Sequence, residues 1–312
     1  MKLTPVSPAD LQASVIAVPP LARNADLTLN REANRALISY MEAGGVRSLM
    51  YGGNANFYNL PLSEYAATLD FLAEAAGADT WMLPSAGPDY GRLIDQAAVL
   101  RERRFPTAMV LPSQFPSTDA GIARGIRKFA DILGKPAVIY LKSENQIAAD
   151  TLAALVKDGL VCSIKYAVVR EKPEVDAYLS AIIERIGTDI VVSGIGERPA
   201  IVHMRDFGLK SMTSGSICVG PRGSMKLHAL LKAKRYDEAA KIRQAYMPLE
   251  DCRDGMSPIR VLHDAVTLAG IADMGPMLPL LSNLSEAQRE VVGPVARALR
   301  AYDAALDAAK AA

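Results

Sequence analysis

Short apolar runs alternate with longer amphipathic segments through the first 234 residues of the chain. The short runs are rich in β-branched residues and predict buried strands, while apolar residues at three- and four-residue spacing predict helices between them. The predicted strands are Ala13–Val18, Ser48–Gly52, Thr80–Pro84, Thr107–Pro112, Ala137–Leu141, Val161–Ala167, Ile190–Gly194 and Lys210–Ser214. The predicted helices are Arg31–Ala43, Leu62–Ala76, Gly91–Arg103, Ala120–Leu133, Ala148–Lys157, Val175–Ile186, Pro199–Phe207 and Ser224–Lys234.

The alternation of strands and helices predicts the fold class. Strands that are nearly all apolar suit a parallel sheet covered on both faces, and eight βα units predict a (β/α)8 TIM barrel. A doubly wound sheet is the alternative, but no GxGxxG follows the first strand. Residues 1–234 are therefore predicted to form the barrel that carries the active site. Residues 235–312, rich in Ala, Leu and Arg, are predicted to form a C-terminal extension of two to four helices.

Composition narrows the classes of function. The net charge is +1 with both signs dispersed, which disfavours a nucleic-acid partner, and no apolar stretch approaches the length of a membrane span. The cysteines Cys162, Cys218 and Cys252 form no CxxC pair and are expected to be reduced, so a cytoplasmic location is the expectation. The N-terminus does not resemble a signal peptide.

The histidines do not predict a metal site. His203, His228 and His263 lie in helical segments without ligand spacing, and no HxH or HExxH motif occurs. We expect these histidines to be structural and predict neither a metal nor a cofactor.

Lys165 is the first candidate for catalysis. It interrupts the β-prone apolar run Val161–Val169. A lysine on a buried strand is desolvated, which lowers the pKa of its ammonium group, and the neutral amine can form a Schiff base with a ketone. The alternative is an edge-strand lysine that extends to solvent. If Lys165 points into the barrel, strand alternation predicts that Ser163 does too, while Cys162 faces the helices.

Tyr140 and a glycine-rich loop complete a possible constellation. Tyr140 ends the strand before that of Lys165, and neighbouring strands lie about 4.8 Å apart, so both side chains can address one substrate atom. Its phenol is a plausible proton shuttle, although a core tyrosine with a bonded hydroxyl is the alternative. After the second predicted strand, Gly53 and Asn54 expose backbone N–H groups that can bind an anion such as a carboxylate. The alternative there is an ordinary turn.

Taken in order, these motifs resemble the dihydrodipicolinate synthase / N-acetylneuraminate lyase family of class I aldolases, from Ala13 to about Arg300. The family's loop GTTGEFYSLT is similar to Gly52–Pro61, followed by Ser63-Glu64-Tyr65. Its strand-five tyrosine matches Tyr140, and its Schiff-base lysine, in a GIK pattern, matches Lys165 in Ser163-Ile164-Lys165. Its SG-D/E turn looks like Ser193–Glu197.

The resemblance implies roles for these residues. Lys165 and Tyr140 would be catalytic, and Gly53, Asn54, Gly194 and Ser214 would bind substrate. It implies a TIM barrel, a small-molecule 2-oxo acid as substrate and a homo-oligomer, either a dimer or a tetramer. Ser214-Gly215-Ser216 followed by Gly220 could alternatively suggest a phosphate loop.

Departures from the family pattern restrict the activity. Gly53 and Asn54 replace two threonines, Asn145 replaces an arginine, and Gln114-Phe115 lacks the tyrosine of the synthases. Lysine biosynthesis is therefore not expected. Aldol cleavage or dehydration of a sugar-derived 2-oxo-3-deoxy acid is the favoured activity, and binding of a 2-oxo acid without turnover is the alternative. A distal carboxylate could be bound by a cation among Lys142, Arg170, Arg198 and Arg222.

Overall fold

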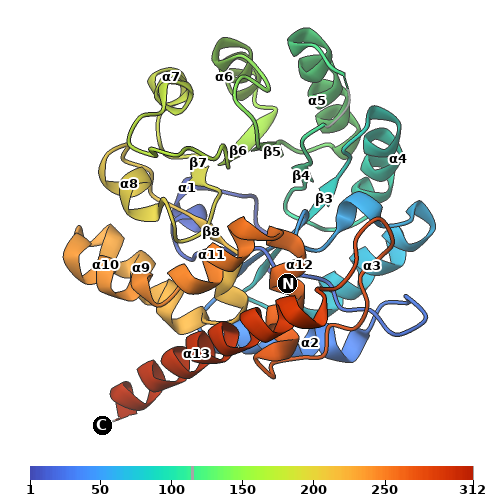
Figure 1. The fold of residues 1–312 in the computed structure, drawn as a ribbon. Coiled ribbons are helices and arrows are strands. Elements are labelled where there is room, and N and C mark those ends of the chain that lie inside the picture. Colours follow the sequence, from blue (N-terminus) through green and yellow to red (C-terminus); the bar gives the residue numbers. More distant parts are fainter. Residues whose placement is uncertain (114–115, 312) are drawn as a thin grey trace.

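The predicted TIM barrel is confirmed by the structure, a computed structural model that describes residues 1–113 and 116–311. Eight parallel strands follow the order β7-β6-β5-β4-β3-β2-β1-β8, and a parallel bridge between Ser193 and Met212 joins the two ends of the sheet. Helices surround the strands (Figure 1). The strands are β1 Ile16–Ala17, β2 Ser48–Tyr51, β3 Trp81–Ala86, β4 Met109–Val110, β5 Ala137–Leu141, β6 Val161–Tyr166, β7 Val191–Ser193 and β8 Thr213–Ser214.

Each predicted helix between the strands is present, with shifts at some of its ends. The short helix α1 (Pro8–Leu11) precedes β1. The surrounding helices are α2 Arg31–Ala43, α3 Leu62–Ala75, α4 Tyr90–Arg101, α5 Asp119–Leu133, α6 Ala149–Lys157, α7 Ala177–Ile186, α8 Ala200–Arg205 and α9 Pro221–Lys232. The largest shift at a helix start is in α9, which begins earlier than predicted because Pro221 suits a first helical turn, where an N–H has no intrahelical partner.

Local capping sets several of the helix boundaries. The side chains of Asn30, Asp89, Thr118 and Asp176 accept hydrogen bonds from backbone N–H groups in the first turns of α2, α4, α5 and α7. Gly134 ends α5 with a φ of 71°, a left-handed conformation that glycine adopts without steric cost. The chain is thereby directed back toward the next strand.

Strands β1, β4 and β8 are shorter than predicted by three or more residues, because regular pairing covers only part of each extended run. Beyond β1, the N–H of Val18 donates to the carbonyl of Ser214, and beyond β4 the N–H of Leu111 donates to that of Ala86. These residues remain part of the barrel wall.

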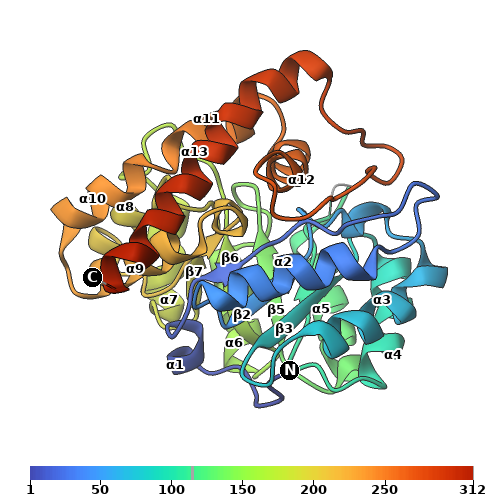
Figure 2. The ribbon, with the colours of Figure 1, turned by 90° about the horizontal axis from the view of Figure 1, so that it is seen from below.

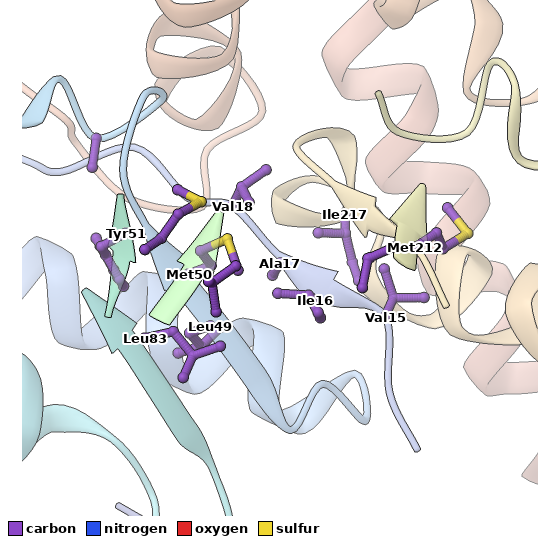
Figure 3. Close-up of a cluster of buried hydrophobic side chains, with 14 of the residues drawn as sticks. Val15, Ile16, Ala17, Val18, Leu49, Met50, Tyr51, Leu83, Met212 and Ile217 are labelled. Carbon is purple, nitrogen blue, oxygen red and sulfur yellow. The ribbon is translucent and has the colours of Figure 1, made fainter. Parts of the chain in front are cut away.

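Side chains from neighbouring strands fill the barrel and its helical layer. Figure 3 shows one part of this core, where Ile16 of β1 lies between Leu49 and Met50 of β2 on one side and Met212 beside β8 on the other. All four are at most 2% exposed. Burial on both faces of the strands explains why their sequences are apolar throughout instead of alternating.

One strand departs from simple alternation. In the pairing of β5 with β6, Ala137 lies opposite Val161 but Val138 lies opposite Ser163, so Cys162 is an extra residue. Its thiol lies 3.7 Å from the hydroxyl of Thr107, across the intervening strand β5. The prediction that Cys162 faces the helices is therefore wrong, because the irregularity breaks the two-residue period below Ser163.

The C-terminal extension consists of α10 Tyr236–Gln244, α11 Met247–Gly255, α12 Pro258–Leu268 and α13 Glu286–Ala311. Helix α10 packs on α9, and α13 packs on α9, α11 and α12. Figure 2 shows α12 at one end of the barrel and α1 at the other. The division of the chain near residue 234 remains a prediction. Over the described residues, every helix is too short or too polar to cross a lipid bilayer.

Candidate active site

A cavity of about 330 Å³ opens at the carboxyl ends of the strands. Its wall contains the residues that follow β2, β5, β6, β7 and β8, together with side chains of α11 and the start of α12. This is the end of a TIM barrel at which catalytic residues gather, because the loops after eight strands converge there. Lys165, Tyr140, Gly53, Asn54 and Gly194 all line this one cavity.

Lys165 lies on β6 with its side chain directed into the cavity. It is 6% exposed and pairs in register with Tyr140 of β5, so the two side chains emerge on the same face of the sheet. Its Nζ atom lies 4.5 Å from the centre of the Tyr140 ring. Burial lowers the pKa of Lys165 to about 7, and the positive charges of Arg253 and Lys142 contribute to the same shift. Close to neutral pH, a large fraction of this amine is uncharged.

Burial acts on Tyr140 in the opposite sense. It raises the pKa of the phenol to about 12, against a smaller opposing effect of the Arg253 charge. Tyr140 therefore holds its proton at neutral pH and can donate it to an oxygen atom that becomes basic during a reaction. A neutral amine and a protonated phenol thus lie side by side.

The loop after β2 presents backbone donors to the cavity. The N–H groups of Gly53 and Asn54 meet no acceptor among the described residues. The side-chain amide of Asn54 donates to the carbonyl of Val18, at 2.8 Å, and this bond fixes the loop against β1. Gly52 is closely packed, because a Cβ atom there would lie 2.6 Å from the hydroxyl oxygen of Ser85 and a neighbouring side chain would have to shift. The loop can therefore offer two N–H groups to an anion.

The structure separates the two remaining predicted substrate-binding residues. Gly194 lines the cavity, and a Cβ atom at this position would lie 2.6 Å from the carbonyl oxygen of Tyr166. Ser214 does not belong to the cavity lining of the described structure. Its hydroxyl accepts a hydrogen bond from the N–H of Ile217, and its neighbours Thr213 and Gly215 line the cavity instead.

Solved structures with a similar fold were found by comparison. The chain superposes on dihydrodipicolinate synthase from Bacillus clausii at 17% identity, with a TM-score of 0.79, covering 92% of this chain and 97% of that one. It has the fold of the dihydrodipicolinate synthase family. No protein-family model matches the sequence, and no curated protein matches it significantly.

Two further structures match equally well. YagE, a prophage protein of the dihydrodipicolinic acid synthase family from E. coli K12 in complex with pyruvate, is 18% identical, with a TM-score of 0.80 over 92% of this chain and 98% of that one. The sialic acid aldolase of Ruminococcus gnavus is 13% identical, with a TM-score of 0.80 over 92% and 97%. At these identities the likeness establishes the fold.

Two charged residues of the wall were missed by the sequence analysis. Glu250 and Arg253 of α11 are 2% and 8% exposed, and Nη1 of Arg253 donates to Oε1 of Glu250 at 2.7 Å. The hydroxyl of Ser216 donates to the same oxygen. The guanidinium group packs against Gly215, where a Cβ atom would lie 2.7 Å from Nη2. Nothing in their spacing distinguishes these residues from an ordinary helical surface pair.

A second carboxyl group lies behind this pair. Glu197 is fully buried, and its Oε1 atom accepts a hydrogen bond from the hydroxyl of Ser224 at 2.6 Å. Burial and the nearby charge of Glu250 raise the pKa of Glu197 to about 7. Two carboxyl groups, those of Glu250 and Glu197, therefore lie near Arg253, and that of Glu250 borders the cavity.

Of the four cations considered for a distal carboxylate, Lys142 lines the cavity. Arg170 pairs with Glu144 and Asp176, and Arg198 pairs with Asp251 and Asp254. Arg222 lies near Asp303 of α13, away from the described cavity wall. The synthase position occupied by Gln114-Phe115 lies outside the described residues.

The histidines have structural surroundings. Nδ1 of His203 lies 2.8 Å from the hydroxyl of Ser193, and Nε2 of His263 lies 2.9 Å from the carbonyl of Gly275. Nε2 of His228 lies 3.3 Å from the carbonyl of Lys210. Among the described residues, no group of three or more His, Cys, Asp or Glu side chains is arranged to hold a metal ion.

Proposed function

We propose that the chain is a Schiff-base-forming lyase that acts on a 2-oxo acid, and that it is a divergent member of the dihydrodipicolinate synthase / N-acetylneuraminate lyase family. The observation that carries the proposal is the buried amine of Lys165, with a pKa of about 7, beside the phenol of Tyr140 in one cavity. A buried lysine without an ion-pair partner is unfavourable for stability, so its presence on a barrel strand favours a chemical role.

In the proposed reaction, the neutral amine of Lys165 attacks the C2 ketone and forms a carbinolamine. Tyr140 donates its proton to the carbinolamine oxygen, which leaves as water, and an iminium cation and a Tyr140 phenolate remain. The iminium accepts electrons from the bond that breaks next. That bond is either C3–C4 or C3–H. Breaking C3–C4, as the C4 hydroxyl gives its proton to the Tyr140 phenolate, releases an aldehyde and leaves the enamine of pyruvate. Breaking C3–H, with the proton passing to the phenolate, forms an enamine that expels the C4 hydroxyl, which takes a proton from Tyr140 and leaves as water. In both cases hydrolysis of the iminium frees Lys165.

The backbone donors after β2 support the assignment of the C1 carboxylate to this loop. Gly53 and Asn54 line the cavity after β2, the strand opposite β6 in the barrel order, and their N–H groups meet no acceptor among the described residues. A carboxylate held there would place C2 between the loop and Lys165. Charged acceptors strengthen such hydrogen bonds, so this interaction would orient the ketone toward the amine.

The polar side chains that α11 contributes to the cavity wall favour a substrate that carries hydroxyl groups. Glu250 already neutralises Arg253, while Oε2 of Glu250 and Nη2 of Arg253 meet no hydrogen-bond partner among the described residues. An acceptor and a donor held side by side suit the hydroxyl groups of a sugar chain, whereas a second carboxylate would be repelled by Glu250. We therefore propose a sugar-derived 2-oxo-3-deoxy acid, and not the substrates of lysine biosynthesis.

Binding without turnover is the second candidate function. It is favoured by the absence of the two loop threonines, since Gly53 and Asn54 carry no hydroxyl group. It does not account for a buried amine. The predicted dimer or tetramer and the cytoplasmic location remain predictions.

Reductive trapping tests the proposal directly. Sodium borohydride added with pyruvate should attach the reduced three-carbon adduct to the peptide that contains Lys165, as read by mass spectrometry. K165A should lose the adduct, while K172A, which changes an exposed lysine, should keep it. Trapping in K165A would reassign the nucleophile. A panel of hydroxylated 2-oxo-3-deoxy acids then tests turnover, through released pyruvate or dehydrated product.

A further inference from the structure

Among the described residues, the buried hydroxyl group of Tyr58 has no hydrogen-bond partner, although the residue lines the active-site cavity. A buried polar atom left unpaired is unfavourable for stability, so such an atom in a folded protein needs an explanation. Of the cavity-lining residues in the described structure, Thr213 also has an unpaired hydroxyl. The surroundings of Tyr58 distinguish it from Thr213.

The position of Tyr58 is fixed by its own loop. Asn56 begins the short 3₁₀ helix η1 (Phe57–Asn59) in a left-handed conformation, with a φ of 55°, and so turns the chain at this point. The carbonyl of Tyr58 accepts a hydrogen bond from Nη1 of Arg92 at 2.6 Å, and the side chain of Asn59 donates to that of Asn56. The backbone at Tyr58 is therefore held in place without a hydrogen bond from its own hydroxyl group.

Gly53 leaves the space that the Tyr58 hydroxyl edge occupies. A Cβ atom on Gly53 would lie 3.5 Å from Cε2 and 3.8 Å from Oη of Tyr58. A side chain extending beyond Cβ, such as a threonine, would compete for the same volume. The glycine that removes a hydroxyl group from the loop thus makes room for another hydroxyl group, which is supplied by Tyr58.

Tyr140 is the second phenol in this part of the cavity. Burial raises the pKa of Tyr58 above its usual value of 10, and the phenol of Tyr140 lies close enough to raise it further. Tyr58 therefore keeps its proton at neutral pH, and its O–H can donate a hydrogen bond to a basic atom. Tyr140 is the neighbouring group that becomes such an atom when it gives up its proton.

We propose that Tyr58 is a positioning residue that donates a hydrogen bond to the phenolate oxygen of Tyr140 during the reaction. This inference rests on the proposed Schiff-base chemistry. When Tyr140 protonates the departing oxygen, its own oxygen becomes negative inside a cavity with little water. The O–H of Tyr58 stabilises that charge until the phenolate takes a proton from C3 of the iminium, which forms the enamine and restores Tyr140. The two hydroxyl groups are not hydrogen-bonded to each other in the structure, so this bond forms only when the oxygen of Tyr140 becomes negative. Removing a donor from a developing oxyanion lowers a rate by about 10²–10³-fold.

The isosteric variant Tyr58→Phe tests the proposal with pyruvate alone. An iminium that forms the enamine exchanges the C3 protons of pyruvate with D2O, and this exchange is measured by proton NMR. Y58F should slow exchange at saturating pyruvate by about 10²-fold or more, while the half-saturating pyruvate concentration stays within about threefold of the wild type. Because the hydroxyl has no partner, the unfolding midpoint of Y58F should equal or exceed that of the wild type.

Tyr90→Phe is the matched control, since Tyr90 is 60% exposed and lies outside the described lining of this cavity. Exchange in Y58F equal to that in Y90F would overturn the inference. A higher half-saturating concentration with an unchanged maximal rate would overturn it as well, because it would assign the hydroxyl to the carboxylate of the substrate. A lower unfolding midpoint would show a structural hydrogen bond. Failure of the wild type to trap or exchange pyruvate would instead refute the proposed function.

Discussion

The amine of Lys165 faces the aromatic ring of Tyr140, at 4.5 Å from the ring centre, and donates no hydrogen bond to its hydroxyl group. A cation above an aromatic ring gains about 0.5–2 kcal/mol, which would favour the protonated amine by up to about 1.5 pKa units. Full burial opposes it with up to about 3–5 pKa units. The effect of burial is the larger one, so the pKa of Lys165 is lowered to about 7. At neutral pH a large fraction of the amine is therefore uncharged, and its lone pair can attack a ketone.

The rate of borohydride trapping at low pyruvate concentration should follow the neutral fraction of Lys165. With a pKa of about 7, this fraction rises about tenfold between pH 6 and pH 8 and then levels off. A lysine with an ordinary pKa would give about a hundredfold rise over the same range, without levelling. Initial rates of adduct formation, determined by mass spectrometry after a short borohydride exposure, distinguish the two profiles.

The variant K165M should stabilise the protein at low pH. The folded-state pKa of Lys165, about 7, is below the unfolded value of 10.5, so the folded state disfavours the charged form. Below pH 7 the wild type therefore loses up to about 5 kcal/mol of stability, and this loss disappears as the pH rises toward 10.5. Methionine has similar length and carries no charge, so K165M should not suffer this loss.

Urea unfolding at pH 6 and pH 9 measures the effect. The difference in free energy of unfolding between K165M and the wild type should be larger at pH 6 than at pH 9. An equal difference at both values would show that the amine is solvated in the folded protein.

Separating Glu250 from Arg253 should destabilise the fold strongly. Each of R253M and E250Q leaves its former partner buried and unpaired, which costs about 3–5 kcal/mol, whereas the double variant leaves neither charge. The double variant should therefore lose less stability than the sum of the two single variants. R253M should also raise the pKa of Lys165, because the charge of Arg253 contributes to lowering it.

An exposed pair serves as the control for this cycle. Arg127 and Asp158 have side chains that are 44% and 45% exposed, and R127M should cost less than about 1 kcal/mol. If the losses of stability in R253M and E250Q simply add in the double variant, Glu250 and Arg253 do not stabilise each other. That result would contradict the proposal that they form a neutral pair offering a donor and an acceptor to a substrate.

The sequence predicts the barrel because its determinants are local. Strand and helix periods, helix caps and glycines such as Gly134 act within a few residues, and the repeat of βα units leaves few topologies. The sequence also predicts that Lys165 and Tyr140 lie next to each other, since neighbouring parallel strands end at the same edge of the sheet. The structure brings these two residues to one cavity with Gly53, Asn54 and Gly194.

Other features depend on contacts that sequence patterns do not encode. The family resemblance assigns Ser214 to the substrate site, but a one-residue difference in a strand changes the face, and Thr213 borders the cavity instead. The extra residue at Cys162 follows from pairing between two strands. Arg253 reaches the cavity because α11 folds back over β8, an arrangement set by packing between segments far apart in the chain.

Helix α11 has a consequence for the evolution and engineering of this barrel. This helix follows the barrel repeat in the sequence, yet it contributes charged side chains to the wall of the cavity, so its loss would open the cavity as well as shorten the protein. Chimeras that join the first 234 residues to the C-terminal helices of another barrel should therefore exchange substrate preference along with those helices.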